Sequence, residues 1–156
     1  MAERVVVIGG DAGGMSAASQ ALRTAKKHGR TLDIVVLERG HWTSYSACGI
    51  PYWTAGIVDG PDELVARTPE EHRRRGIDVR MRTEAVRIDI DRRAVDVVEQ
   101  ESGKRGKVEF DQLVIATGAE PIRPDVPGVD SSGIHGVQTL DDGAALLDRL
   151  ENDDPK

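Results

Sequence analysis

The residue with the most reactive side chain in the sequence is its one cysteine, Cys48, which lies in the segment SYSACGIPYW. A thiolate is a nucleophile and a redox group. With a single cysteine in the chain, neither an internal disulfide nor a metal site built on several cysteines can form. The thiol alone leaves two interpretations open. It is either a redox centre that works with an outside molecule or a buried structural cysteine, which is the commoner role of a free thiol.

A glycine-rich segment, VIGGDAGGMSAA, has the features of a phosphate-binding turn. It follows a β-branched run and precedes small and apolar residues at helical spacing, so it predicts a strand, a tight turn and a helix. The free N–H groups and dipole of a helix N-terminus attract a pyrophosphate. Gly9 and Gly14 take the first and third glycine positions of this fingerprint. Asp11 takes the second, where a carboxylate repels an anion unless it points away or caps the helix.

Glu38 is a second indication of a nucleotide site. It stands at the C-terminal end of a buried run, LDIVVLERG, where an acidic side chain can hold both hydroxyls of a ribose. A carboxylate there disfavours a phosphate on that ribose, because two anions would meet. The alternative is a glycine-rich turn with no ligand and a solvated strand end. The two features in this order favour a nucleotide site.

A parallel sheet is needed to position these groups. Two buried runs, Arg4–Gly10 and Leu32–Gly40, flank a helix that ends at Gly29, which is the pattern of a βαβ unit. A further buried run, Leu113–Ala116, returns to the sheet. We therefore predict an α/β fold: a Rossmann-like domain with a parallel sheet and an inserted β-meander.

The region between the second and last buried runs predicts a short helix and three strands. Thr68 as N-cap, Pro69 in the first turn and Glu71 in a capping box predict a helix that ends at Gly76. The meander strands are expected at Ala85–Ile90, Ala94–Glu99 and Lys107–Phe110, with turns at residues 91–93 and 102–106. After a proline-rich linker, one more strand-like turn and a helix, Asp141–Leu150, are expected.

Composition restricts the partners and the location. The 156 residues are 38% hydrophobic and 31% charged, as in a globular protein. The net charge of -6 argues against nucleic acid as a partner. No apolar run is long enough for a membrane span or a signal peptide, and the single cysteine fits a reducing compartment, so a cytoplasmic location is expected. The four histidines lack the spacing of metal ligands, and no metal is expected.

With the loop, the acidic residue and the thiol in place, the sequence resembles the FAD domain of the pyridine nucleotide–disulfide oxidoreductases. It is similar to the branch with one redox cysteine, which comprises coenzyme A-disulfide reductases, NADH oxidases and peroxidases, and persulfide reductases. The resemblance covers nearly the whole chain. The segments that carry it are GGDAGGMSAASQALR, ERG…SYSACGIPYW, RTPEEHRRRGIDVR and QLVIATGAEPIRP.

The resemblance implies FAD as the cofactor. In this family the ATG-type turn passes close to the FAD, and the first meander strand lies by the adenine. The residues that it assigns to the cofactor are Gly9, Gly10, Asp11, Ala12, Gly13, Gly14, Glu38, Arg39, Val86, Ala116, Thr117 and Gly118.

The resemblance also assigns Cys48 as the catalytic residue. It implies that one thiol both meets the substrate and communicates with the flavin, at the start of a short helix whose dipole stabilises a thiolate. Electrons would pass from NAD(P)H through FAD to a disulfide or sulfenate at Cys48. The resolving partner would be an outside molecule: coenzyme A thiol, a persulfide, or peroxide giving Cys-SOH.

Coenzyme A-disulfide reductases contact their substrate through residues that match Ser16, Gln20, Arg23 and Ser44. Two positions depart from those enzymes. Ala47 replaces a frequent Asn, and Glu71 stands where a Lys can occur. The substrate is therefore expected to be a small thiol or disulfide, with an NADH oxidase or peroxidase as the alternative.

Full-length relatives carry further regions: a second glycine fingerprint for NAD(P)H and a dimerisation domain. We expect residues 1–120 to form the FAD-binding portion, and residues 121–156 to form a linker and the start of an NAD(P)H-binding domain. A homodimer is expected for the full-length form only, and this chain alone is expected to be inactive. A different class of function, a catalytically silent nucleotide-binding or assembly module, stays open.

Overall fold

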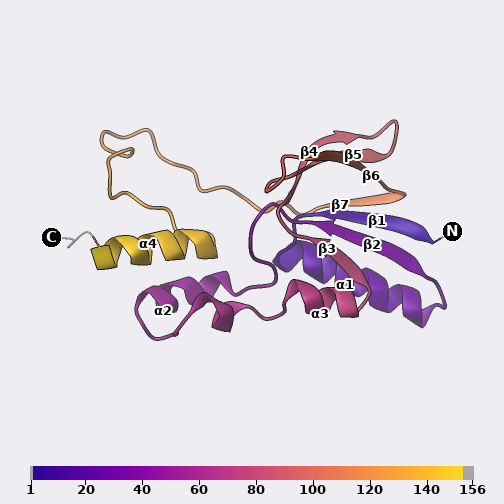
Figure 1. Cartoon of the computed structure of the whole chain (residues 1–156), viewed down its shortest axis with the longest axis horizontal. Coiled ribbons are helices and arrows are strands. Elements are labelled where there is room, and N and C mark those ends of the chain that lie inside the picture. Colours follow the sequence, from indigo (N-terminus) through magenta and orange to yellow (C-terminus); the bar gives the residue numbers. More distant parts are fainter. Residues whose placement is uncertain (1, 153–156) are drawn as a thin grey trace. The chain divides into compact units, whose positions relative to one another are not determined.

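The computed structural model describes residues 2–152. Within them it contains seven strands and four α-helices, with two short 3-10 turns (Figure 1). In chain order these are β1 (Glu3–Ile8), α1 (Ala12–Lys27), β2 (Leu32–Leu37), η1 (Ala47–Gly49), α2 (Ile50–Thr54), η2 (Pro61–Leu64), α3 (Pro69–Arg74), β3 (Ile77–Arg80), β4 (Thr83–Asp89), β5 (Ala94–Glu99), β6 (Arg105–Glu109), β7 (Gln112–Ile115) and α4 (Leu140–Asn152).

The contacts divide the chain into two units, which we describe separately. The first comprises the residues up to Tyr45 together with Arg67–Gly118, and the second comprises Ser46–Ala66 and the described residues from Ala119 onward. The first unit contains a parallel sheet of order β3-β2-β1-β7. β1 pairs in parallel with both β2 and β7. This confirms the predicted α/β fold with a parallel sheet.

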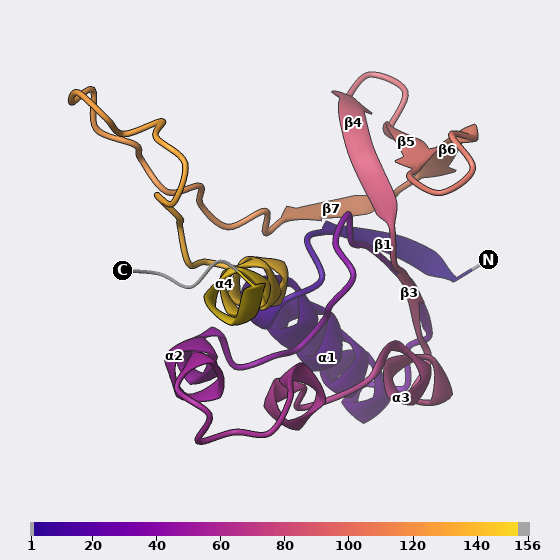
Figure 2. The same cartoon turned by 60° about the vertical axis from the view of Figure 1, so that its left-hand side comes forward.

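Both faces of the parallel sheet are covered, which explains its unbroken β-branched runs. Figures 1 and 2 show α1 and α3 on one face and β4, β5 and β6 on the other. Toward the helices, Val5 and Val7 pack with Met15 and Ala18 of α1. Toward the other sheet, Val6 and Ile8 belong to a core cluster that includes residues of β5 and β6. The sheet is thus the middle of three layers.

The predicted meander forms as an antiparallel sheet of order β4-β5-β6, with a register shift between Ala85 and Arg87. The turn expected at residues 102–106 is shorter than predicted. Arg105 and Gly106 already pair with Val98 and Val97 as part of β6. A Cβ on Gly106 would lie an ordinary 3.5 Å from Val97, so this glycine extends in an edge strand without acting as a turn residue.

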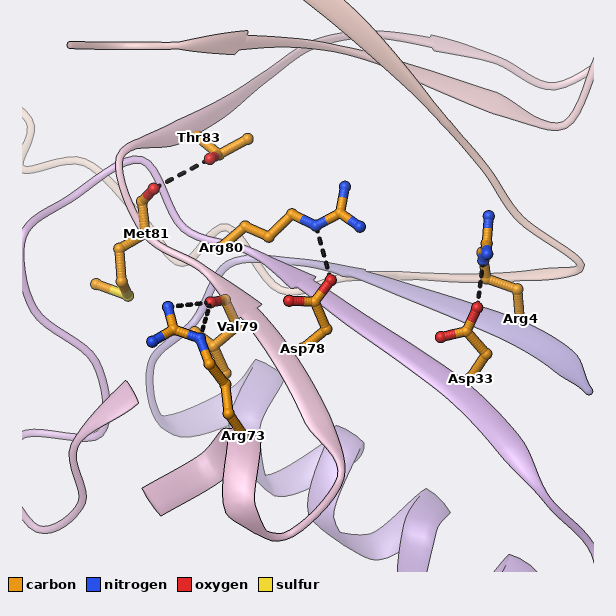
Figure 3. A network of polar contacts seen from close by, with 8 residues as sticks. All are labelled: Arg4, Asp33, Arg73, Asp78, Val79, Arg80, Met81 and Thr83. Atoms are coloured by element: carbon orange, nitrogen blue, oxygen red, sulfur yellow. Dashed lines mark hydrogen bonds and ion pairs between the residues drawn. The ribbon is translucent and has the colours of Figure 1, made fainter. Parts of the chain in front are cut away.

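β3 was not predicted from the sequence; it extends the sheet in parallel beside β2. It follows α3, whose capping box is confirmed: Thr68 accepts from the Glu71 N–H, and Glu71 accepts from the Thr68 N–H. Arg73 of α3 donates to the Val79 carbonyl of β3 through two nitrogens, at 2.7 and 3.1 Å (Figure 3). This guanidinium satisfies a carbonyl of the edge strand that would otherwise have no ladder partner.

The second unit is built mainly from α2 and α4, with the two 3-10 turns. Gly143 of α4 packs so closely on α2 that a Cβ there would lie 2.9 Å from both Ile50 and Trp53. The predicted terminal helix forms, but the strand-like turn before it does not, because residues 134–139 pair with no strand in the described chain. The helix begins instead with a local cap, in which Thr139 and Asp142 bond reciprocally.

Candidate functional site

The glycine loop between β1 and α1 is fixed by close contacts between backbone atoms. Gly9 has a φ of +103°, and a Cβ there would lie 2.2 Å from the Ala116 carbonyl oxygen. A Cβ on Gly14 would lie 1.8 Å from the Gly9 carbonyl oxygen. Gly13 is different, because its nearest neighbour would be the Ala116 Cβ at 3.8 Å. The loop therefore requires glycine at Gly9 and Gly14 and has space beside Gly13.

The N-terminus of α1 can accept an anion. The Met15 N–H donates to the Asp11 carbonyl at 2.9 Å, so the amides of the preceding turn have no partner within the helix. No acidic residue occupies the first turn of α1, and two lysines lie in its last turn. The residues Gly13 and Gly14 thus present N–H groups at the positive end of a sixteen-residue helix.

Asp11 stands at the N-cap position, but its carboxylate makes no capping hydrogen bond to the helix. It accepts from the Tyr45 N–H at 3.3 Å. Burial is the main cause that raises the pKa of Asp11, with a contribution from the nearby Glu38 carboxylate, against the N–H groups of Tyr45 and Ala12. The sequence left two arrangements open for Asp11: a carboxylate that caps the helix, or one that points away from it. The structure has the second, because the carboxylate accepts from the N–H of Tyr45 and does not cap α1.

Glu38 is held directly beside the glycine loop. One of its carboxylate oxygens accepts from the Gly10 N–H at 2.6 Å, and the other accepts from the Gly40 N–H at 2.6 Å. Each carboxylate oxygen has a second lone pair that can accept from a hydroxyl. The next residue, Arg39, is exposed, and its carbonyl accepts from Arg82 at 3.3 Å. The acidic group and the phosphate-type loop, separate in sequence, are therefore joined by a direct hydrogen bond.

The turn after β7 reaches the same loop. The Ala116 N–H donates to the Ile8 carbonyl at 2.8 Å, and the Thr117 nitrogen would lie 3.2 Å from a Cβ on Gly9. Gly118 turns the chain with a φ of +71°. Val86 lies farther along β4 and is half exposed. The first residue of β4, Thr83, nevertheless lies beside Glu38, because the Thr83 N–H donates to the Glu38 carbonyl at 2.8 Å.

Three of the four predicted substrate residues share one exposed face of α1. Gln20 accepts from Arg23 at 2.7 Å and donates to Thr24 at 3.1 Å, and Ser16 lies one turn before it. The fourth, Ser44, lies on the loop after β2, where its Oγ is 2.9 Å from the Nε2 of His72. The structure therefore places Ser16, Gln20 and Arg23 together and gives Ser44 a separate partner.

Two residues of this region were missed by sequence reasoning. Thr43 is buried, and its hydroxyl donates to the Gly10 carbonyl. His72 is 1% exposed, although it lies in a helix of charged residues. A threonine and a histidine of ordinary spacing carry no signal in one sequence, because both roles depend on contacts made across about thirty residues.

Cys48 lies in the second unit, in the turn η1 that leads into α2. The short helix expected after the thiol is confirmed, with Pro51 in its first turn. The Gly49 N–H donates to the Ser46 carbonyl at 2.9 Å, and the Ser46 N–H donates to Leu64 at 2.8 Å. Cys48 itself is exposed. Its side chain is thus open to reaction, as a redox role requires and a buried structural role does not.

Residues 2–152 contain no cluster of three or more His, Cys, Asp and Glu side chains that could hold a metal ion. Within the same residues, no helix has both the length and the apolar character needed to cross a membrane.

Comparisons with known proteins agree with this arrangement. Residues 3–154 match the family model described as pyridine nucleotide-disulphide oxidoreductase. An NADH oxidase of Methanocaldococcus jannaschii is 34% identical over 149 residues, which are 95% of this chain and 32% of the relative. An NAD(P)H coenzyme A polysulfide/persulfide reductase of Pyrococcus horikoshii is 36% identical over 152 residues, covering 97% of this chain and 32% of the relative.

A solved structure gives the same picture. The crystal structure of reduced Bacillus anthracis CoADR-RHD superposes with a TM-score of 0.90 at 25% identity, covering 99% of this chain and 28% of that one. The chain therefore spans about a third of the length of the curated relatives it matches. Since the family model covers β1, the glycine loop and the cysteine turn alike, this chain belongs to the pyridine nucleotide-disulphide oxidoreductase family.

Proposed function

We propose that this chain is the FAD-binding portion of a flavin-dependent oxidoreductase that passes electrons from NAD(P)H to a single redox cysteine, Cys48, and on to the sulfur–sulfur bond of a substrate such as coenzyme A disulfide or a persulfide. Residues 1–120 are proposed as the FAD-binding part, and residues 121–156 as a linker and the start of an NAD(P)H-binding domain. The observation that carries the proposal is the 2.6 Å hydrogen bond between Glu38 and the Gly10 N–H. This bond joins a carboxylate suited to binding a ribose to a glycine loop suited to binding a phosphate.

The residues present fit the cofactor. The first-turn N–H groups of α1 are suited to a pyrophosphate, and the space beside Gly13 lets such a group approach the backbone. The two Glu38 oxygens are suited to the hydroxyls of an unphosphorylated ribose. FAD, when bound, supplies two-electron transfer between a nicotinamide and a thiol–disulfide pair.

Cys48 is proposed to act as the nucleophile toward the substrate. In its thiolate form, the sulfur attacks one sulfur of a disulfide such as coenzyme A disulfide. A mixed disulfide forms at Cys48, and the other half leaves as a thiolate, so that no net oxidation occurs in this step. The exposure of Cys48 supports such an attack. The exposed polar face with Ser16, Gln20 and Arg23 is proposed to contact the coenzyme, and Arg23 offers a guanidinium to a phosphate.

A second candidate is an NADH oxidase or peroxidase, because the relative in Methanocaldococcus jannaschii bears the name NADH oxidase. In that case the Cys48 thiolate attacks one oxygen of a peroxide. An S–O bond forms and the O–O bond breaks, which leaves a sulfenic acid and, after protonation, water. Coenzyme A disulfide and hydrogen peroxide, offered separately to the chain, distinguish the candidates by the mass added to Cys48.

The cofactor assignment is tested by titrating the chain with FAD and, separately, with NAD, and following flavin fluorescence and heat of binding. We expect FAD to bind in preference to NAD. We also expect Glu38→Gln to weaken FAD binding by about ten- to a hundredfold, because a charged acceptor to two N–H groups and the ribose is lost.

Asp33→Asn is a matched control for this substitution. Asp33 lies near the start of β2, the strand whose C-terminal end precedes Glu38, and its carboxylate pairs with Arg4 at 2.6 Å (Figure 3). This control should bind FAD as the wild type does. An equal or stronger preference for NAD over FAD, or equal FAD affinities for Glu38→Gln and Asp33→Asn, would overturn the assignment.

A further inference from the structure

The segment Thr43–Tyr45 is held at each of its three residues by a different partner. The Thr43 hydroxyl donates to the Gly10 carbonyl, and the Tyr45 N–H donates to Asp11. Between them, Ser44 adopts a left-handed backbone with a φ of +51°. This conformation is costly for a residue with a side chain and persists where the surroundings impose it. The direction of the Ser44 side chain is therefore fixed by its neighbours.

His72 is the partner of the Ser44 side chain. Its Nε2 lies 2.9 Å from the Ser44 Oγ. Its other ring nitrogen, Nδ1, is buried and has no hydrogen-bond partner in the described part of the chain. A neutral imidazole carries its one proton on either Nδ1 or Nε2. The position of this proton decides whether Ser44 accepts a hydrogen bond from His72 or donates one to it.

The surroundings of His72 favour a neutral ring. Burial is the main cause that lowers the pKa of His72, and the positive charges of Arg67 and Arg75 add to it, against the single opposing charge of Glu71. On β3, the strand that packs against α3, Asp78 and Arg80 are exposed and paired with each other at 2.8 Å. A neutral imidazole has one N–H donor and one acceptor nitrogen.

The buried Nδ1 decides which nitrogen carries the proton. A proton on Nδ1 would leave a buried N–H without an acceptor, which is rare and costly in folded proteins. A proton on Nε2 leaves only an unused lone pair at Nδ1, which is better tolerated. In that arrangement the Nε2–H donates to the Ser44 oxygen, and the hydroxyl proton of Ser44 is left for another acceptor.

We propose that His72 is a positioning residue that holds Ser44 as a hydrogen-bond donor toward the substrate. The acceptor is an oxygen or sulfur atom of a coenzyme A-type molecule. The identity of this ligand rests on the proposed function, whereas the proton position in the His72–Ser44 pair does not. The reverse tautomer would turn the Ser44 hydroxyl toward His72 and remove the donor.

The proton position is tested by long-range ¹H–¹⁵N NMR of the histidine rings in the chain at neutral pH. The chain has four histidines, and the loss of one signal in His72→Gln identifies His72. We expect a neutral ring protonated at Nε2. A ring protonated at Nδ1, or a doubly protonated ring, would overturn the proposal, whatever the chain binds.

The ligand is tested by measuring the affinity of the chain for coenzyme A in three variants. Ser44→Gly removes the hydroxyl and suits the left-handed backbone. His72→Leu removes the ring donor, and His72→Gln can still donate from a similar position. We expect Ser44→Gly and His72→Leu each to weaken binding about tenfold, and His72→Gln to stay within about threefold of the wild type.

Urea unfolding shows whether each variant is folded. If His72→Leu is unfolded, Ser44→Gly, His72→Gln and the ring tautomer still decide the question. Unchanged coenzyme A affinity in Ser44→Gly would refute the donor role. A wild-type chain that fails to bind coenzyme A would instead refute the proposed thiol substrate, and the NMR measurement would still decide how His72 holds Ser44.

Discussion

The glycine loop and the cysteine turn each contain a glycine at which a side chain would meet a neighbouring atom at the same short distance, but the two positions differ in how well they should tolerate a substitution. At Gly9, a Cβ would lie 2.2 Å from a backbone carbonyl oxygen, and the φ of +103° excludes ordinary side chains as well. At Gly49, next to Cys48, a Cβ would also lie 2.2 Å from its nearest atom, but this atom is a methyl of Leu64 and φ is an ordinary -80°. One site is confined by backbone and the other by a side chain that can rotate.

The two regions differ in what their proposed roles require: a precisely placed backbone in the glycine loop, and an accessible sulfur in the cysteine turn. A loop that is to bind an anion through its N–H groups, as we propose for this one, needs its backbone placed to within a few tenths of an ångström. The turn that presents a thiol needs only to keep the sulfur accessible, and Cys48 is exposed. We therefore expect substitutions in the loop to cost more stability than substitutions in the turn.

The pair Gly9→Ala and Gly49→Ala gives the largest expected difference. Gly9→Ala must move the Ala116 backbone and adopt a positive φ, so we expect it to lower the free energy of unfolding by about 3 kcal/mol or more. Gly49→Ala must move only the end of Leu64, and we expect a loss of about 1–2 kcal/mol. Urea unfolding followed by circular dichroism measures both. Equal losses would show that the contrast between backbone and side-chain confinement is wrong.

The parts of the fold that sequence predicted are those with a local cause. β1 and β2 were predicted because both of their faces are buried, which leaves long β-branched runs. α3 was predicted because a capping box is made of residues three apart. β3 was missed because its four residues, IDVR, alternate buried and exposed and are too few for a periodic signal. A strand-like turn was expected between the proline-rich linker and the last helix, but a strand forms only where a partner strand is available.

In the candidate site, too, the features with a local cause in the sequence were predicted, and those that depend on distant contacts were not. The glycine loop and Glu38 were recognised because both stand at strand ends in a fixed order, and their hydrogen bond confirms only that they meet. Their roles, like that of Cys48, stay predictions. The contacts of Thr43, Ser44 and Tyr45 were not predictable, because each joins ordinary residue types that are 28 to 34 positions apart. Such contacts arise from the packing of whole elements.

Asp11→Asn tests the loop with a smaller expected effect, whose sign follows from the raised pKa of Asp11. The raised pKa means that the folded chain binds a proton at Asp11 more tightly than the unfolded chain does. The ionised carboxylate therefore destabilises the fold above its folded pKa, and this penalty disappears below the unfolded value of 3.8. Asparagine keeps an oxygen for the Tyr45 N–H and removes the charge. We expect a gain of less than about 1 kcal/mol at neutral pH, because the group is only half-buried.

The measurement for Asp11→Asn is urea unfolding of wild type and variant between neutral pH and pH 3.8. The difference in unfolding free energy should shrink as the pH falls through the folded pKa. A variant that is less stable than the wild type at neutral pH would show that the negative charge of Asp11 supports the loop.

Cys48→Ser is expected to change stability least and reactivity most. The thiol is exposed and lies on a turn whose hydrogen bonds run through the backbone of Ser46 and Gly49. We therefore expect the free energy of unfolding to stay within about 0.5 kcal/mol of the wild type, and FAD affinity to be unchanged. Reaction with an aromatic disulfide reagent and formation of a mixed disulfide with coenzyme A disulfide, followed by intact mass, should both be lost, because the chain has no second cysteine. A stability loss above about 1 kcal/mol, or a loss of FAD binding, would assign Cys48 a supporting role in the fold and remove the contrast between a confined loop and a tolerant, reactive turn.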